Sequence, residues 1–245
     1  MEKNKNNKSL LLHVCCAPCS VMCVQSLKDE GFDLTAFFFN PNIHPFSEYK
    51  KRMETLRAFC AAENIKLIAP LKDGLFGVLF SPQDQDEFLS GKTLNERRDS
   101  SYSPPDGNGV PDSLSQNKNV FLSGKTLNRF AAEGYGLYNF LSAAAGRPYP
   151  ARCAVCYETR LDETARFAKE NGYGGFSTTL FISPYQNHGL LKTTAETAAE
   201  RYQTALLYRD FRALFREGQS RAKAAEMYMQ KYCGCIFSEY ENAKK

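Results

Sequence analysis

Short apolar runs alternate with helix-like segments near the start of this chain, and that alternation limits its fold more than any other feature. The runs 10–14, 34–39 and 65–69 have the length and composition of buried strands. The segments 20–30 and 48–64 between them are rich in helix-forming residues. The order β-α-β-α-β predicts an α/β fold, with a Rossmann-like, mostly parallel sheet covered by helices on both faces. Such sheets bind their ligands at the carboxyl ends of the strands.

The second half of the chain returns to this texture. Residues 157–170 have a helical pattern, residues 175–182 resemble a strand, and residues 193–231 suggest C-terminal helices interrupted near Gly218. A chain of 245 residues can hold one such domain with a full core but is short for two equal domains. We therefore expect a single α/β domain over residues 1–245.

Residues 81–134 differ in composition from the rest of the chain. Ser, Asn, Asp, Gly and Pro dominate there, and the octapeptide Phe-Leu-Ser-Gly-Lys-Thr-Leu-Asn occurs at 88–95 and again 33 residues later. Its Gly-Lys-Thr lacks the glycine that a phosphate-binding loop needs five residues earlier, because Asp86 and Asn119 stand at those positions. We expect a weakly ordered insertion here rather than a nucleotide site.

The amino-terminal residues indicate a cytoplasmic protein with no membrane contact. Residues 1–9 are rich in Lys and Asn, and the apolar run after them is too short for a signal-peptide core or a membrane span. Nine cysteines in such a chain argue against a disulfide framework, since cytosolic thiols are kept reduced. The net charge of +4 is compatible with a polyanionic partner but does not establish one.

Seven of the nine cysteines fall into three tight clusters. Each cluster lies at an edge between predicted elements: after the first strand, just before a helix, and just after the last helix. Loops of this kind allow thiolates, which are soft metal ligands, to converge. The clusters are Cys15, Cys16 and Cys19; Cys153 and Cys156; and Cys233 and Cys235. The two other cysteines, Cys23 and Cys60, lie on helical faces and are expected in the core.

Three kinds of chemistry fit these thiols. Structural zinc needs four ligands, so seven cysteines overfill one zinc site, and a zinc-stabilised nucleic-acid-binding protein stays open as an alternative. An iron–sulfur cluster takes three or four thiolates and leaves the remainder for a second metal or for redox chemistry. Cys16-Ala17-Pro18-Cys19 alone suggests a thiol-disulfide oxidoreductase, a function that gives the other two clusters no role.

The cysteine clusters belong to a longer series of motifs. The series comprises residues 12–19 (Leu-His-Val-Cys-Cys-Ala-Pro-Cys), residues 40–45 (Asn-Pro-Asn-Ile-His-Pro) with Glu48, Tyr49 and Arg52, residues 152–157 with Arg160 and Leu161, residues 176–180, residues 183–187, and residues 232–238 (Tyr-Cys-Gly-Cys-Ile-Phe-Ser). In these motifs, and in their order along the chain, the sequence resembles the QueH-type epoxyqueuosine reductases. The long duplicated stretch before Arg152 departs from the family pattern.

The resemblance implies a tRNA-modifying oxidoreductase. Its reaction would be the last step of queuosine biosynthesis, in which the epoxide of epoxyqueuosine in tRNA is removed with two electrons and two protons and water leaves. The resemblance also implies a 4Fe-4S cluster, a second mononuclear iron or other metal nearby, an unidentified electron donor, and a fold akin to adenine nucleotide alpha hydrolases. The single domain would then be a metal-binding catalytic domain.

Residues near the motifs are candidates for specific roles. His13, His44, Tyr157 and His188 are candidate proton donors because of their positions, although a single histidine is more often structural. Thr178, Thr179 and Tyr185, at a strand end and in the loop after it, are expected to line the pocket. The expected substrate-binding residues in the earlier motifs are Asn40, Asn42, Glu48 and Arg52, where Glu48 and Arg52 equally suit an exposed helical ion pair.

A cationic face is a candidate surface for tRNA phosphates. Arg209, Arg212 and Arg216 have the i, i+3, i+7 spacing of one helix face. An ordinary solvated face, with Asp210 and Glu217 nearby, explains the same spacing equally well. Further cations are Lys50, Lys51, Arg221 and Lys223.

Overall fold

The structure is a computed structural model that describes residues 8–70, 140, 143–144 and 146–243. Apart from Pro70, these residues belong to one compact unit. The insertion predicted at 81–134, with its two Gly-Lys-Thr sequences, lies outside the described residues. Among the described helices, none is long and apolar enough to cross a membrane.

Parallel strands form the centre of this unit. In the described residues the sheet has four strands in the order β3-β2-β1-β4, and every pair is parallel. Leu10, Leu11 and Leu12 in β1 are at most 2% exposed because elements cover both faces of the sheet. The strands are β1 (Ser9–His13), β2 (Asp33–Phe37), β3 (Lys66–Ile68) and β4 (Gly175–Thr178).

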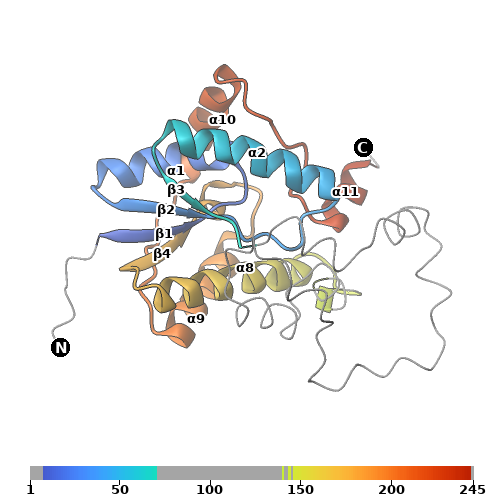
Figure 1. The fold of residues 1–245 in the computed structure, drawn as a ribbon. Helices are drawn as coiled ribbons and strands as arrows, with labels where there is room; N and C mark the ends of the chain where they lie inside the picture. Colours follow the sequence, from blue (N-terminus) through green and yellow to red (C-terminus); the bar gives the residue numbers. More distant parts are fainter. Residues whose placement is uncertain (1–7, 71–139, 141–142, 145, 244–245) are drawn as a thin grey trace, which may run out of the picture. The chain divides into compact units, whose positions relative to one another are not determined.

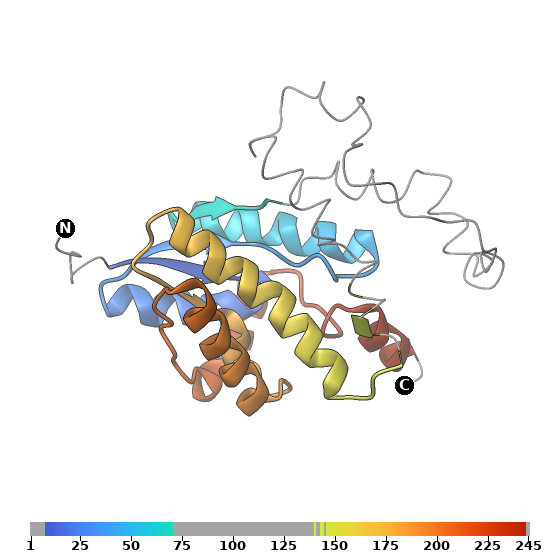
Figure 2. The ribbon, with the colours of Figure 1, turned by 90° about the horizontal axis from the view of Figure 1, so that it is seen from below.

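Helices lie on the two faces of the sheet, as Figures 1 and 2 show. Helices α1 (Ala17–Asp29) and α2 (Phe46–Ala62) cover one face, and α8 (Ala151–Glu170), with α9 (His188–Tyr202) beside it, lies on the other. The α/β fold with a parallel sheet is therefore confirmed. Likeness to adenine nucleotide alpha hydrolases stays a prediction.

The order of the strands creates a topological switch point. The chain moves from β1 to β2 to β3 in one direction, whereas β4 pairs with the opposite side of β1. Ligands of open α/β sheets bind where the order reverses, outside the carboxyl ends of the two strands concerned. The carboxyl ends of β1 and β4 lead directly into Cys15 and Thr179.

Two predicted boundaries near the site were wrong. Helix α8 begins at Ala151, after Pro150, so Cys153 and Cys156 lie in its first two turns rather than before it. Strand β4 ends at Thr178 because the Thr178 hydroxyl accepts a hydrogen bond from the Leu180 amide at 3.1 Å and caps the short helix η2 (Thr179–Ile182).

The C-terminal region differs from the predicted helices broken at Gly218. Helix α9 ends at Tyr202 because the next residue, Gln203, caps it with a left-handed backbone at φ 50°, and an irregular stretch follows. Gly218 lies inside a helix and packs on α1, where a Cβ would lie 3.3 Å from Met22 Cγ. The remaining elements are η3 (Arg212–Leu214), α10 (Phe215–Ala224) and α11 (Ile236–Ala243), of which α11 was not predicted.

The predicted cationic helix face does not exist as one face. Arg209 precedes η3, Arg212 begins η3, and Arg216 lies in α10. Two of these cations are also paired with acids, since Arg209 bonds Glu30 at 2.9 Å and Arg212 bonds Asp210 at 2.6 Å. The regular spacing in sequence therefore came from three different local structures.

Candidate metal centre

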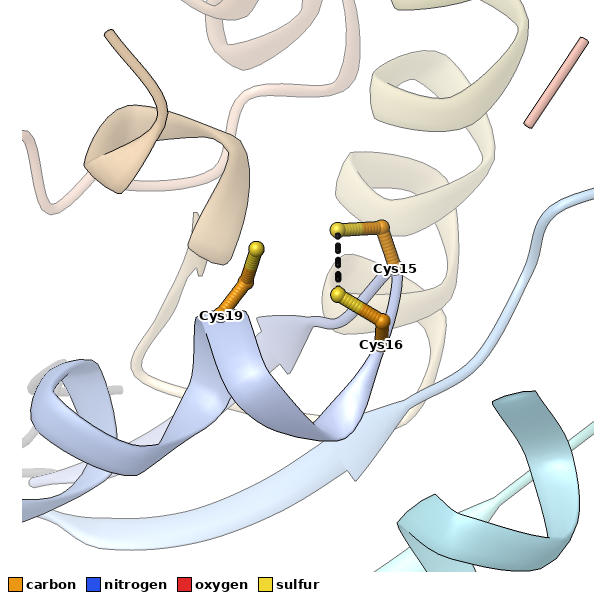
Figure 3. Close-up of side chains that lie close together, drawn as sticks. All are labelled: Cys15, Cys16 and Cys19. Carbon is orange, nitrogen blue, oxygen red and sulfur yellow. Dashed lines mark hydrogen bonds between the residues drawn. The ribbon is translucent and has the colours of Figure 1, made fainter. Parts of the chain in front are cut away.

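Cys15, Cys16 and Cys19, which we term the first thiol group, gather at the carboxyl end of β1. Their sulfur atoms all lie within 4.8 Å of one another, and Cys15 Sγ is 3.7 Å from Cys16 Sγ (Figure 3). Cys16 is the N-cap of α1 with extended backbone, and a proline stands in the first turn, where it displaces no helical hydrogen bond. The strand–helix junction thus aims three buried thiols at one point.

Hydrogen bonds within the first thiol group shift the pKa values of its three thiols. The thiols of Cys16 and Cys19 donate to Cys15, and these hydrogen bonds hold the pKa of Cys15 well below its usual range. The same bonds keep the pKa values of Cys16 and Cys19 above theirs. A metal ion that binds all three sulfurs as thiolates would displace the protons that they carry.

Cys153, Cys156, Cys233 and Cys235 form the second thiol group, which comes from two segments. Burial, and then the charges of Cys233 and Cys235, raise the pKa of Cys153 to about 11. Burial likewise raises the pKa of Cys156 to about 12. These thiols therefore lie within electrostatic range of one another, although among the described residues only the first thiol group brings three sulfurs within 4.8 Å. Cys233 is exposed and Cys153 and Cys235 are partly so.

Arg52 holds the loop that carries Cys233 and Cys235. Its guanidinium donates to the Cys233 carbonyl at 3.0 Å, to the Tyr232 carbonyl at 2.9 Å and to Glu48 Oε1 at 2.7 Å. Gly234 between the cysteines has φ +118°, and a Cβ there would lie 2.9 Å from Arg52 Nη1. The pair of Glu48 and Arg52 is thus buried rather than exposed and holds this loop, while its role toward a substrate stays a prediction.

Two buried arginines bring positive charge to both thiol groups. Arg52 and Arg160 are 2% and 1% exposed, and both lower the pKa of Cys15. Arg160 also lowers the pKa of Cys156. Buried charges need compensating partners. Arg52 is paired with Glu48 at 2.7 Å, whereas Arg160 donates to the uncharged Asn42 Oδ1. Thiolates of a bound cluster would add negative charge near both cations.

Side-chain amides face three of the sulfurs. Asn42 Nδ2 lies 3.1 Å from Cys156 Sγ, Gln230 Nε2 lies 2.9 Å from Cys16 Sγ, and Gln186 Nε2 lies 3.7 Å from Cys233 Sγ. N–H donors of this kind tune metal-bound thiolates. Gln230 and Gln186 were not among the predicted site residues. Gln186 lies within the motif 183–187, and Gln230 lies just before the motif 232–238.

The candidate proton donors differ in their surroundings, and His188 bonds Tyr208 at 3.0 Å away from the thiols named above. His13 is buried, its Nε2 donates to the Phe39 carbonyl at 3.3 Å, and its Nδ1 accepts from Thr178 at 2.9 Å; burial lowers its pKa to about 4. His44 Nδ1 donates to Glu239 Oε2 at 2.6 Å. His13 therefore has the contacts of a structural bridge between strands, whereas His44 has a carboxylate partner.

Tyr157, the third candidate, is buried beside the second thiol group. Its hydroxyl donates to Gln186 Oε1 at 2.8 Å and accepts from the Asn187 amide at 3.2 Å. Burial, followed by the charges of Cys153 and Cys156, raises its pKa far above the usual value. Tyr157 thus keeps its proton and joins the thiols to the loop after η2.

Some of the remaining predicted residues are buried near the first thiol group, and others are exposed. Thr179 Oγ1 lies 3.4 Å from the Cys15 amide and 3.8 Å from Cys15 Sγ. Asn40 is buried and donates to the Val14 carbonyl at 2.9 Å, which secures the strand end. Tyr185, in contrast, is 76% exposed and makes an edge contact with Phe215. Their roles toward a substrate stay predictions.

The fold and the thiols together define a class: an α/β protein with a buried cysteine cluster that could hold a metal at the switch point of a parallel sheet. Comparison with known proteins gives the family. The model of the family described as "Epoxyqueuosine reductase QueH" matches residues 10–73 and 115–241, so the chain belongs to this family. It is an oxidoreductase of queuosine biosynthesis, and the resemblance seen in the motifs is confirmed.

Relatives from distant bacteria match nearly end to end. The epoxyqueuosine reductase QueH of Dehalococcoides mccartyi is 28% identical over 236 residues, covering 96% of this chain and 95% of the relative. The QueH protein of Thermotoga maritima is 27% identical over 239 residues, covering 97% of this chain and 93% of the relative. The match therefore includes both thiol groups.

Proposed function

We propose that this protein reduces the epoxide of epoxyqueuosine within tRNA to give queuosine, the last step of queuosine biosynthesis, with a 4Fe-4S cluster and a second mononuclear iron held by its cysteines. The observation that carries the proposal is the convergence of the three buried sulfurs of the first thiol group. Nine free cysteines and a tRNA substrate fit the cytoplasmic location expected from the sequence.

The residues present suit an iron–sulfur cluster. Thiolates are its ordinary ligands, and the two thiol groups together offer seven. That number exceeds what one cluster or one zinc ion takes, so it leaves ligands for a second metal. The buried cations Arg52 and Arg160 offset the negative charge, and the amides of Asn42 and Gln230 face ligand sulfurs.

His44 is the residue best placed to move a proton. Its backbone is fixed to the loop of the second thiol group, because its amide donates to the Gly234 carbonyl at 2.7 Å and its carbonyl accepts from Tyr232 at 2.8 Å. Glu239 accepts from Nδ1 and orients the ring. We assign His44 the protonation of the epoxide oxygen as its two C–O bonds break, with the second proton drawn from solvent, so that the oxygen leaves as water. When bound, the metals would supply the two electrons, which an unidentified donor would replace.

The loop after η2 offers a surface for the nucleic acid. Tyr185 presents an exposed aromatic ring, and the edge contact with Phe215 fixes its orientation. Proteins recognise single-stranded RNA by stacking its bases on such rings. Gln186, the next residue, contacts Cys233 and Tyr157. A base stacked on Tyr185 would therefore lie beside the second thiol group, with Arg216 in the neighbouring helix α10.

Anaerobic purification followed by turnover tests this function. Iron, sulfide and zinc are measured, a visible spectrum is recorded, and the protein is incubated with tRNA that contains epoxyqueuosine and with a reductant. The proposal predicts several irons with sulfide, a brown chromophore and conversion to queuosine. A colourless zinc protein that leaves the tRNA unchanged would instead support the zinc-stabilised nucleic-acid-binding function.

A further inference from the structure

Asn42 lies between Arg160 and Cys156, and the chemistry of these three side chains fixes the orientation of its amide. Arg160 Nε and Nη2 lie 3.0 and 2.8 Å from Asn42 Oδ1. A guanidinium has donors and no acceptor, so the atom that faces it must be the amide oxygen. The amide nitrogen therefore faces the other way and donates an N–H to Cys156 Sγ at 3.1 Å.

The three residues are held in a buried and rigid setting. Asn42 is 0% exposed and Arg160 is 1% exposed, so water does not compete for these bonds. Arg160 follows Cys156 by one turn of α8, while Asn42 belongs to the loop after β2. Hydrogen bonds in such a low-dielectric setting are stronger than at the surface and polarise one another.

We propose that Asn42 is a positioning residue of the metal centre: its amide, oriented by Arg160, donates a hydrogen bond to the Cys156 thiolate and so raises the reduction potential of the bound metal. The inference rests on the proposed function, because it takes Cys156 as a ligand. A donor to a ligand sulfur offsets negative charge, and the reduced centre carries more of that charge. The role differs from the substrate contact that the sequence suggested for Asn42.

The two other amides near sulfurs lack this fixed geometry. Gln186 lies at 3.7 Å from the exposed Cys233, which is a long contact. Gln230 lies at 2.9 Å from Cys16 Sγ, but within the described part of the chain its buried Oε1 has no hydrogen-bond partner that would fix the amide orientation. Only for Asn42 does a neighbouring cation decide which atom faces the sulfur.

Asn42→Asp is the direct test. Aspartate has the shape of asparagine and keeps both bonds to Arg160, but it presents an oxygen instead of an N–H to Cys156. We expect a lower reduction potential in a redox titration and a loss of metal to a chelator about 10–100-fold faster than in the unmodified protein. A folded Asn42→Asp protein with unchanged potential and unchanged metal retention would overturn the proposal.

Asn171→Asp is the matched control. Asn171 follows the other end of α8, and its amide donates to the Phe167 carbonyl at 2.9 Å on the surface. The control adds the same charge at the far end of the helix that carries Cys156, about 20 Å from Cys156 by the rise of an α-helix. Potential and metal retention should match those of the unmodified protein, and an equal shift in the control would also overturn the proposal.

Two further measurements decide the matter if Asn42→Asp does not fold. Arg160→Lys keeps the charge but replaces the rigid fork by one rotatable group, so the potential should shift in the same direction by a smaller amount. In the unmutated protein labelled with ¹⁵N-asparagine, pulsed EPR of the reduced centre should detect a nitrogen coupling. An unshifted Arg160→Lys protein, or the absence of that coupling, refutes the role of Asn42.

The chelator experiment separates this inference from the proposed function. A protein that holds zinc alone would refute the iron–sulfur cluster, yet the rate of zinc loss from Asn42→Asp would still report on the amide. If the protein contains iron and sulfide and turns over, but Asn42→Asp changes neither metal retention nor the reduction potential, only the inference is refuted.

Discussion

The two thiol groups are built in different ways. The first thiol group comes from one strand–helix junction, is fully buried, and brings its sulfurs within 4.8 Å of one another. The second thiol group joins the start of α8 to the loop before α11 and includes the exposed Cys233. Local backbone geometry suffices for the first, whereas the second depends on long-range contacts through Arg52 and Asn42.

This difference suggests that the two thiol groups have different roles. Under the proposed function, a buried, preformed group would hold metal away from solvent, while a group with an exposed thiol would be reachable by a large substrate. Arg160 lowers the pKa of Cys15 in the first thiol group and the pKa of Cys156 in the second, so its charge acts on both groups. Substitutions within each thiol group, and in the contacts that support it, can therefore test whether the two groups have different roles.

Loss of a cysteine should have the largest effect. Cys16→Ala, Cys153→Ala and Cys233→Ala should each abolish turnover and remove metal, because a thiolate ligand has no substitute at these positions. Metal analysis and single-turnover conversion of tRNA measure both. Cys23→Ala is the control, since Cys23 lies buried in α1 outside the first thiol group and should leave metal content unchanged. Full metal content and activity in any of the three ligand variants would remove that cysteine from the site.

His44→Gln should have the next largest effect and should separate chemistry from metal binding. Loss of a general acid typically costs about 10²–10⁴-fold in kcat, while iron content should stay unchanged. His188→Gln is the control, because its imidazole packs against Phe181 and bonds Tyr208 at 3.0 Å. Normal turnover in His44→Gln would mean that another group donates the proton. Tyr157 is the next candidate, and Tyr157→Phe would test it.

Gly234→Ala should weaken the second thiol group alone. The left-handed backbone at φ +118° and the contact with Arg52 Nη1 make a Cβ costly there, by about 1–3 kcal/mol. We expect a lower melting temperature of the metal-free protein and faster loss of metal to a chelator. Gly172→Ala is a matched control, because Gly172 has φ +73° but its Cβ would meet no atom within 4 Å. If both variants lose metal equally fast, the strain rather than the Arg52 contact is responsible.

The same contrast explains how much the sequence could predict. Apolar runs and cysteine clusters are local patterns, and they correctly predicted β1, the parallel sheet and the grouping of Cys15 with Cys16 and Cys19. Helix α8 was placed too late because its first turns, after Pro150, lack a strong apolar period. Sequence patterns therefore predicted the part of the site that is formed by residues close together in the sequence.

Residues that act across the fold were harder to assign. Arg52 and Asn42 were recognised as part of motifs, but nothing in their spacing shows that one clamps a loop from the C-terminal region and the other faces a thiol in α8. Gln230 lies three residues before Cys233, yet it contacts Cys16 at the opposite end of the sequence. Such roles depend on tertiary packing, which no periodicity encodes.

The smallest effect should come from Tyr185, and it tests whether substrate approaches on the side of the second thiol group. Tyr185→Ala should raise KM for tRNA about tenfold with little change in kcat, since stacking of a base on an aromatic ring is worth about 1–3 kcal/mol. Tyr185→Phe keeps the ring and should behave like the unmodified protein. Tyr149→Ala removes another exposed tyrosine, 57% exposed, as the control. An unchanged KM in Tyr185→Ala would mean that tRNA binds elsewhere, and the exposure of Cys233 would then need a different explanation, such as access for the electron donor.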